Sequence, residues 1–85
     1  MIVVLNVLFY TRKNCKLCEE AYALLTVLQN EYEFTIEERD IETNDEWLEE
    51  YQLIIPVIHI NDTILNCNMI DFVQLEQALR QKSRH

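Results

Sequence analysis

A long apolar segment that passes directly into a helical pattern constrains this fold more than any other feature. Residues 2–10 are apolar at all but one position, and a run of this length predicts a buried strand. From there on, apolar side chains recur at the spacing of one helix face at Leu17, Ala21, Leu24, Leu25 and Leu28. A strand followed by a helix is therefore predicted, with Cys15 and Cys18 at their junction.

These two cysteines have the spacing of a reversible dithiol pair. The first backbone N–H groups of a helix are unpaired and carry partial positive charge, so a thiolate at Cys15 is stabilised and its pKa is expected to fall. Three cations, Arg12, Lys13 and Lys16, act in the same direction. Cys18 follows one helical turn later and can close a disulfide with Cys15. The pattern predicts Cys15 and Cys18 as catalytic residues.

Other roles for the pair remain open at this point. The same spacing supplies half of a zinc site, but only Cys67, His59 and His85 remain as ligands and they show no paired spacing, so we expect no metal. Inert buried thiols are a second alternative, because free cysteine is common in protein cores. A third is a binding or adaptor protein without catalytic turnover. Thiol titration separates these hypotheses, since only an enzyme needs a lowered Cys15 pKa.

Length and charge narrow the class of protein. The chain has 85 residues, of which 49% are hydrophobic and 26% charged, which suits one soluble domain over residues 1–85. The net charge of -8 argues against nucleic acid and anionic membranes as partners. The first apolar run lacks the basic flank and cleavage site of a signal peptide. We therefore expect a cytoplasmic protein, and a monomer.

In the rest of the chain, alternating apolar and polar residues predict strands, and apolar residues at helical spacing predict helices. The first helix should end near Gln29, and the only proline, Pro56, opens a strand where its missing N–H costs no ladder bond. Asn61 and Asp62 form a two-residue hairpin connection. The later predicted elements are strands at Glu33–Arg39, Ile54–Ile60 and Thr63–Asn66, and helices at about Thr43–Gln52 and Ile70–Gln81.

The same spacing predicts which side chains are buried. The first helix carries a wide apolar stripe that includes Tyr22, Ala23 and Val27, so we expect this helix to be largely buried. His59 is expected to face solvent, and Cys67 to be a small buried hydrophobe. The buried face of the last helix is predicted to be Phe72, Leu75, Ala78 and Leu79.

Glycine is absent, although average usage would give about six in a chain of this length. Asparagine tolerates left-handed backbone next best, and we expect it at the joints, at Asn30, Asn44, Asn61, Asn66 and Asn68. Without glycine there is no support for a Gly-rich phosphate loop. A group of acids at Glu37, Glu38, Asp40 and Glu42 is expected to be a solvated face, with docking of a basic partner as the functional alternative.

Several motifs in order resemble the small glutaredoxin-like proteins of bacteria, within the thioredoxin-fold superfamily. They are the stretch from Leu8 to Ala21 with its cysteine pair, then Asp40–Ile41, Tyr51 and Ile55–Pro56–Val57. The resemblance covers nearly the whole chain. It implies an α/β fold of order β-α-β-α-β-β-α, a four-stranded mixed sheet in the order 2-1-3-4, and three helices with the second on the opposite face from the others.

The resemblance also implies a function, thiol–disulfide oxidoreductase. It implies a cis Pro56 beside the cysteines, with the Ile55 backbone pairing with a bound peptide or glutathione. Leu17 and the stretch Asn66–Asp71 replace residues with which glutaredoxins hold glutathione. The expected substrates are protein disulfides or glutathione mixed disulfides, with glutathione as a candidate co-substrate, no bound cofactor, and a thiol reductant or reductase as partner. The expected substrate or glutathione site consists of Tyr10, Arg12, Lys13, Ile55, Pro56 and Asp71.

Overall fold

The apolar run forms the central strand of the sheet. In the computed structural model, which describes residues 5–83, it is β1 (Leu5–Thr11), and the predicted strand residues 2–4 lie outside the described range. The other elements are α1 (Lys16–Leu28), β2 (Phe34–Asp40), a 3-10 turn η1 (Ile41–Thr43), α2 (Asp45–Tyr51), β3 (Val57–Ile60), β4 (Thr63–Leu65) and α3 (Phe72–Ser83). The predicted order of strands and helices is therefore confirmed over the described residues.

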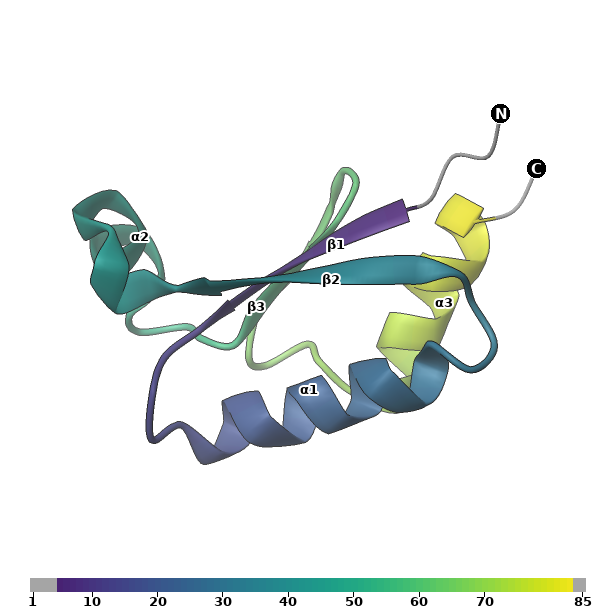
Figure 1. The fold of residues 1–85 in the computed structure, drawn as a ribbon, viewed down its shortest axis with the longest axis horizontal. Coiled ribbons are helices and arrows are strands. Elements are labelled where there is room, and N and C mark those ends of the chain that lie inside the picture. Colours follow the sequence, from purple (N-terminus) through teal and green to yellow (C-terminus); the bar gives the residue numbers. More distant parts are fainter. Residues whose placement is uncertain (1–4, 84–85) are drawn as a thin grey trace.

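The four strands form one mixed sheet in the order β2-β1-β3-β4, as predicted (Figure 1). β1 pairs in parallel with β2 and antiparallel with β3, and β3 pairs antiparallel with β4. Because of these directions, β1, β2 and β4 end, and β3 begins, at the same end of the sheet along the strand direction. The loops that follow Thr11, Asp40 and Leu65, and the loop that precedes Val57, consequently share one end of the molecule.

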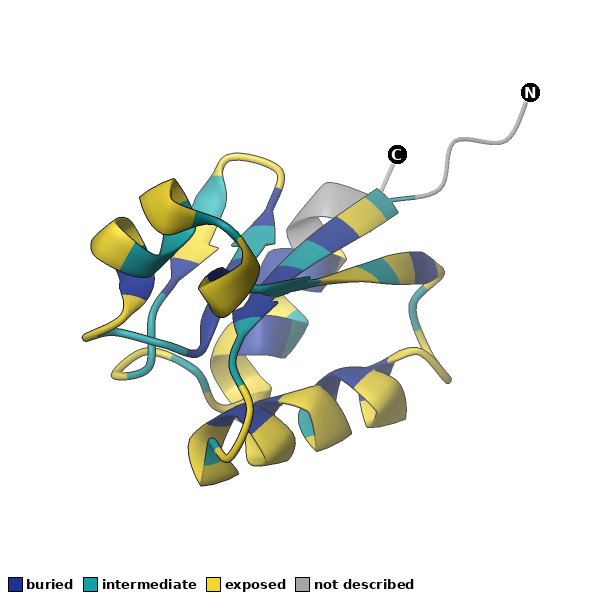
Figure 2. Ribbon diagram, turned by 60° about the vertical axis from the view of Figure 1, so that its left-hand side comes forward, coloured by how far each residue is buried: buried dark blue, intermediate teal, exposed yellow. Residues whose placement is uncertain are grey.

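The face of the sheet covered by α1 and α3 holds the larger hydrophobic core. Val7 and Phe9 of β1 point to this face, and Leu25, Leu28 and Leu75 of the two helices are fully buried against it. The prediction of a largely buried α1 is wrong, because its buried positions form one narrow stripe (Figure 2). Four members of the predicted stripe are exposed, namely Leu17, Tyr22, Ala23 and Val27. Phe72, predicted for the buried face of the last helix, is exposed at the start of α3 as well.

The opposite face carries a smaller core under α2. Its buried members are Tyr10, Ile41, Tyr51 and Val57. The ring of Tyr10 lies 4.4 Å from that of Tyr51 and 5.0 Å from that of His59, and the Arg39 guanidinium donates to the Tyr10 hydroxyl at 2.9 Å. The prediction that His59 faces solvent is wrong, because alternation along β3 turns its half-buried ring into this aromatic group.

Electrostatics in this smaller core favour neutral rings. Burial lowers the pKa of His59 below its ordinary value, the charge of Arg39 acts in the same direction, and Glu50 opposes both. Burial likewise raises the pKa of Tyr51. The Tyr51 hydroxyl lies 3.5 Å from Nε2 of His59, so the two polar tips of this core meet inside it.

Turns without glycine are made in two ways. Among the described residues only Asn14 (φ 59°) and Asn61 (φ 54°) have left-handed backbone, so Asn61 fits the prediction and the other four expected asparagines do not. Asn44 instead caps α2 by accepting from the N–H groups of Glu46 and Trp47. Within residues 5–83, left-handed asparagines thus occur only in the β3–β4 hairpin and directly before the cysteine pair.

Candidate active site

Cys15 and Cys18 are joined by a disulfide at the start of α1, with their Cα atoms 5.2 Å apart. Cys15 is the N-cap of this helix, and its Sγ accepts the backbone N–H of Cys18 at 3.1 Å. The left-handed Asn14 turns the chain from β1 into this cap. The local sequence therefore places one sulfur where unpaired helix N–H groups point, and its mate one turn further on.

The two sulfurs differ in their access to solvent. Cys15 is half-buried at the margin of the larger core, whereas Cys18 belongs to that core and is only 2% exposed. Between them, Lys16 is exposed and Leu17 is 57% exposed. A substrate can therefore approach Cys15 from solvent, while Cys18 can be reached only by Cys15. This asymmetry suits an attacking and a resolving thiol.

The loop before β3 brings a second part of the predicted site to the same end of the sheet. The Ile55–Pro56 bond is cis, as the resemblance implied. The loop is held by the backbone N–H of Cys67, which donates to the carbonyl of Ile54 at 3.0 Å. Ile55 packs on the margin of the larger core, as Cys15 does. Cys67 itself is half-exposed rather than buried, so that prediction is wrong.

The cations near Cys15 are not equivalent. The guanidinium of Arg12 lies 2.6 Å from the Glu42 carboxylate, so its charge is largely matched within the protein. Lys13 and Lys16 are exposed and make no ion pair in the described part of the chain. Lys16 consequently adds positive charge beside the cysteine pair, opposed by Glu19 in the first turn of α1, whereas Lys13 lines one hollow together with the acids Glu38 and Asp40.

Two of the residues predicted to bind substrate have other contacts in the structure. Tyr10 lies in the smaller core and is 4% exposed, in contact with Tyr51 and Arg39. Asp71 precedes α3, where its carboxylate accepts the N–H of Gln74 at 2.8 Å and so caps the helix. Tyr10 is thus placed as a core side chain, and Asp71 has a structural role at the start of α3.

The comparisons with known proteins agree with this geometry. A family model described as "Glutaredoxin-like domain (DUF836)" matches residues 6–80 of the chain. The chain belongs to this glutaredoxin-like family. A curated glutaredoxin-like protein from Dictyostelium discoideum is 32% identical over 88 residues, which cover 92% of this chain and 82% of that relative.

Solved structures place this glutaredoxin-like protein in the thioredoxin fold. A protein from Nitrosomonas europaea, determined by solution NMR, is 30% identical with a TM-score of 0.75, and the match covers 93% of this chain and 95% of that one. A thioredoxin variant from Halobacterium salinarum shares 12% identity at a TM-score of 0.68, over 95% of this chain and 76% of the other, and supports the fold alone. Over residues 5–83, no helix combines the length and apolar character needed to cross a membrane.

A hollow at the end of β1, whose lining reaches to two residues before Cys15, was not predicted from the sequence of this glutaredoxin-like protein. It is lined by Thr11, Arg12, Lys13, Glu38 and Asp40, at the carboxyl ends of the parallel strands β1 and β2. The sequence predicts Glu37, Glu38, Asp40 and Glu42 as one solvated face, but the register of β2 puts Glu38 and Asp40 on the opposite side from Glu37. Glu38 lies opposite Phe9 and faces the side of α1, whereas Glu37 faces the other side. Alternation along β2 is the sequence signal that could have separated them.

Proposed function

We propose that this protein is a thiol–disulfide oxidoreductase that uses Cys15 as the attacking thiol and Cys18 as the resolving thiol. The observation that carries the proposal is the asymmetry of the pair: a half-buried cysteine at a helix N-terminus is bonded to a cysteine in the core. Membership in the glutaredoxin-like family supports it. The coincidence of helix terminus, exposure and bonding distance is what disulfide exchange requires.

In the proposed reaction, the Cys15 thiolate attacks one sulfur of a substrate disulfide. A bond forms between these two sulfurs, and the other substrate sulfur leaves as a thiolate that takes up a proton. Cys18 then gives up its proton and attacks Cys15, which forms the Cys15–Cys18 disulfide and releases the first substrate sulfur as a thiol. Two electrons pass from the protein to the substrate. A dithiol or two monothiols must return them.

Several groups favour the reactive form of Cys15. In the disulfide form, the backbone N–H of Cys18 donates to Sγ of Cys15, and the same N–H is available to a Cys15 thiolate. The helix N-terminus adds partial positive charge. Lys16 adds an exposed positive charge nearby, which Glu19 in the first turn of α1 opposes. We therefore expect the Cys15 pKa of the reduced protein to lie below the ordinary value of about 8.5.

The cis Ile55–Pro56 segment supplies a place for an extended substrate. Within the described residues, no hydrogen bond uses the backbone N–H or carbonyl of Ile55, so both are free to pair with a peptide strand. Exposed Leu17 suits contact with a polypeptide. We propose protein disulfides as the main substrates, with glutathione as a candidate co-substrate or reductant, no bound cofactor, and a reducing compartment such as the cytoplasm as the setting.

Thiol titration and trapping test the function. Rates of alkylation of the reduced protein against pH should give a Cys15 pKa clearly below about 8.5. Cys18→Ser should accumulate mixed disulfides with substrate proteins, because the resolving step is lost, and Cys15→Ser should trap none. Cys67→Ser is the matched control and should behave as wild type. An ordinary Cys15 pKa together with no trapping by Cys18→Ser would contradict the proposal and favour an adaptor.

A further inference from the structure

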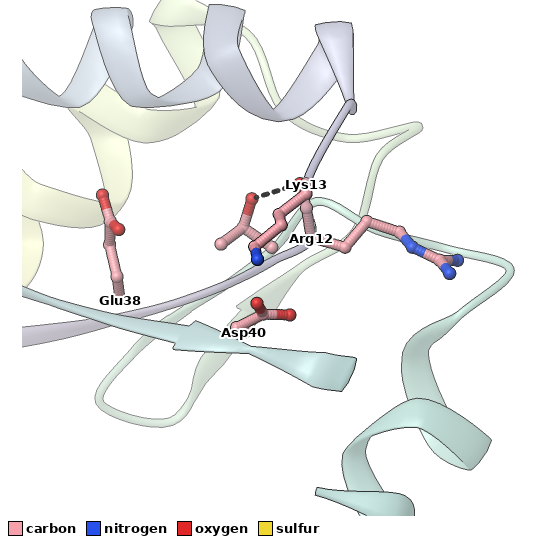
Figure 3. A pocket seen from close by; sticks show the side chains of 5 residues that line it. Arg12, Lys13, Glu38 and Asp40 are labelled. Carbon is pink, nitrogen blue, oxygen red and sulfur yellow. Dashed lines mark hydrogen bonds between the residues drawn. The ribbon is translucent and has the colours of Figure 1, made fainter. Parts of the chain in front are cut away.

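The hollow at the end of β1 has a volume of about 370 Å³. Its lining side chains come from two places, the end of β1 with the following loop, and the end of β2. Figure 3 shows the Lys13 ammonium over the Asp40 carboxylate and Glu38 at the far end, while Arg12 extends away from them. In the register of the parallel pair, Glu38 and Asp40 lie opposite Phe9 and Thr11, so the hollow opens on the face of the sheet that α1 covers.

The charges that line this hollow are not balanced. Arg12 is neutralised by Glu42 at 2.6 Å. One oxygen of Asp40 accepts the backbone N–H of Glu42 at 2.9 Å, which leaves its other oxygen free. In the described part of the chain, the Glu38 carboxylate makes no ion pair or side-chain hydrogen bond, and Lys13 makes no ion pair. One cation therefore faces two carboxylates, a net charge of one negative unit.

We propose that this hollow is a specificity subsite for a lysine or arginine side chain of the polypeptide whose disulfide reacts at Cys15. The inference rests on the proposed function and adds the class of substrate. The cationic tip would pair with Glu38 and the free oxygen of Asp40. Lys13 would donate to carbonyl groups of the same polypeptide, while the Thr11 hydroxyl keeps its bond to the Arg12 carbonyl at 3.5 Å.

Size and position support a side chain rather than a whole small molecule. The volume is at the small end of the range for ligand clefts, which suits one long side chain. Lys13 precedes Cys15 by two residues, and an extended chain spans about 3.3 Å per residue, so the basic residue should lie a few positions from the reactive cysteine of the substrate. The net charge of -8 also attracts basic polypeptides over longer range.

Peptides that differ only in one side chain test the subsite. Each peptide carries one cysteine as a mixed disulfide with a chromophoric thiol, and lysine or norleucine stands two, three or four residues from it on either side. Reduction by the pre-reduced wild-type protein is followed by release of the coloured thiolate. At low salt we expect kcat/KM to favour lysine about fivefold at the best position, because exposed charge pairs contribute modestly. Raising the salt from about 0.05 M to about 0.5 M should reduce this preference.

Charge variants assign the preference to the hollow. Glu38→Gln keeps the shape and removes a carboxylate without other contacts, so the lysine preference should fall to about twofold or less. Glu38→Gln with Asp40→Asn should abolish it. Glu33→Gln is the matched control, because it removes the same charge from an exposed position at the opposite end of β2, and it should retain the full preference.

The outcomes separate this inference from the function on which it rests. Equal rates for lysine and norleucine peptides in the wild type, at every position, would overturn the subsite alone. So would a preference that survives intact in the double variant, whose folding is checked by circular dichroism. No reaction with any of the peptides would overturn both the subsite and the proposed function.

Discussion

The two faces of the sheet hold cores of different chemical character. The larger core, between the sheet and helices α1 and α3, is built from aliphatic side chains, phenylalanines and Cys18. The smaller core, under α2, has two tyrosines among its four buried residues, and Arg39 and His59 contact their rings. Two groups of the smaller core, Tyr51 and His59, have pKa values shifted by burial, so the packing of this core is expected to respond to pH.

The two cores position different parts of the candidate active site. The larger core fixes Cys18 and leaves Cys15 at its margin, so it determines the geometry of the pair. The smaller core positions α2, from which the chain leads to the cis Ile55–Pro56 bond. Ile55 packs against both cores. A substitution in either core can thus shift Ile55, whose backbone is proposed to pair with the substrate.

The largest expected difference between the two cores is in the free energy of unfolding that is lost when a leucine is truncated in each. Leu25→Ala empties a fully buried position in the larger core and should lower the free energy of unfolding by about 2–5 kcal/mol. Leu48→Ala removes a half-buried side chain from the margin of the smaller core and should cost about 1 kcal/mol. Urea denaturation of both variants measures the difference. Equal losses would show that the two cores contribute alike.

Removing one hydroxyl should test whether the smaller core depends on its polar contacts. Tyr10→Phe leaves the Arg39 guanidinium without the acceptor at 2.9 Å and should lower the free energy of unfolding by about 1 kcal/mol. Tyr32→Phe is the matched control, because Tyr32 packs on the larger core and its hydroxyl makes only long contacts, donating to Glu76 at 3.4 Å and accepting from Arg80 at 3.5 Å. Its loss should be clearly smaller in the same urea measurement, and an equal loss would contradict a special role for the Tyr10 hydroxyl.

The smallest expected effect is a pH dependence of stability through His59. Its pKa in the folded protein is lowered, so between that value and the ordinary value near 6.5 the unfolded chain binds more protons than the folded one. Stability from this group is complete above pH 6.5 and is lost as the pH falls, at less than about 1.4 kcal/mol per pH unit. His59→Phe should flatten the difference in unfolding free energy between pH 7 and pH 5. An unchanged slope would refute the assignment.

Sequence reasoning predicted the architecture because hydrophobic periodicity reflects burial directly. The run before Tyr10 and the recurrence after Leu17 defined the first strand and helix, and the cysteine pair followed from their junction. The cis Pro56 came only from the family resemblance, since the bare sequence does not distinguish the two isomers. The elements that the sequence predicts best are thus those whose apolar residues follow a single period.

The errors arose where tertiary packing decides between equal local options. Tyr22 and Val27 continue an apolar stripe, but the sheet offers α1 only one narrow contact face. His59 is polar, yet the pleat of β3 and the position of α2 enclose its ring. The pairing of Arg12 with Glu42, and the convergence of Lys13 with the β2 acids, depend on strand register that no single segment encodes.

The burial of Cys18 links redox chemistry to folding by a closed thermodynamic cycle. The difference in folding free energy between the oxidised and reduced forms must equal the difference in disulfide strength between folded and unfolded chains. Any aliphatic substitution in the larger core that accommodates a thiol and a disulfide unequally will therefore shift the reducing power of the protein. Homologues could diversify their redox poise through such interior changes, while the surface around Cys15 stays the same.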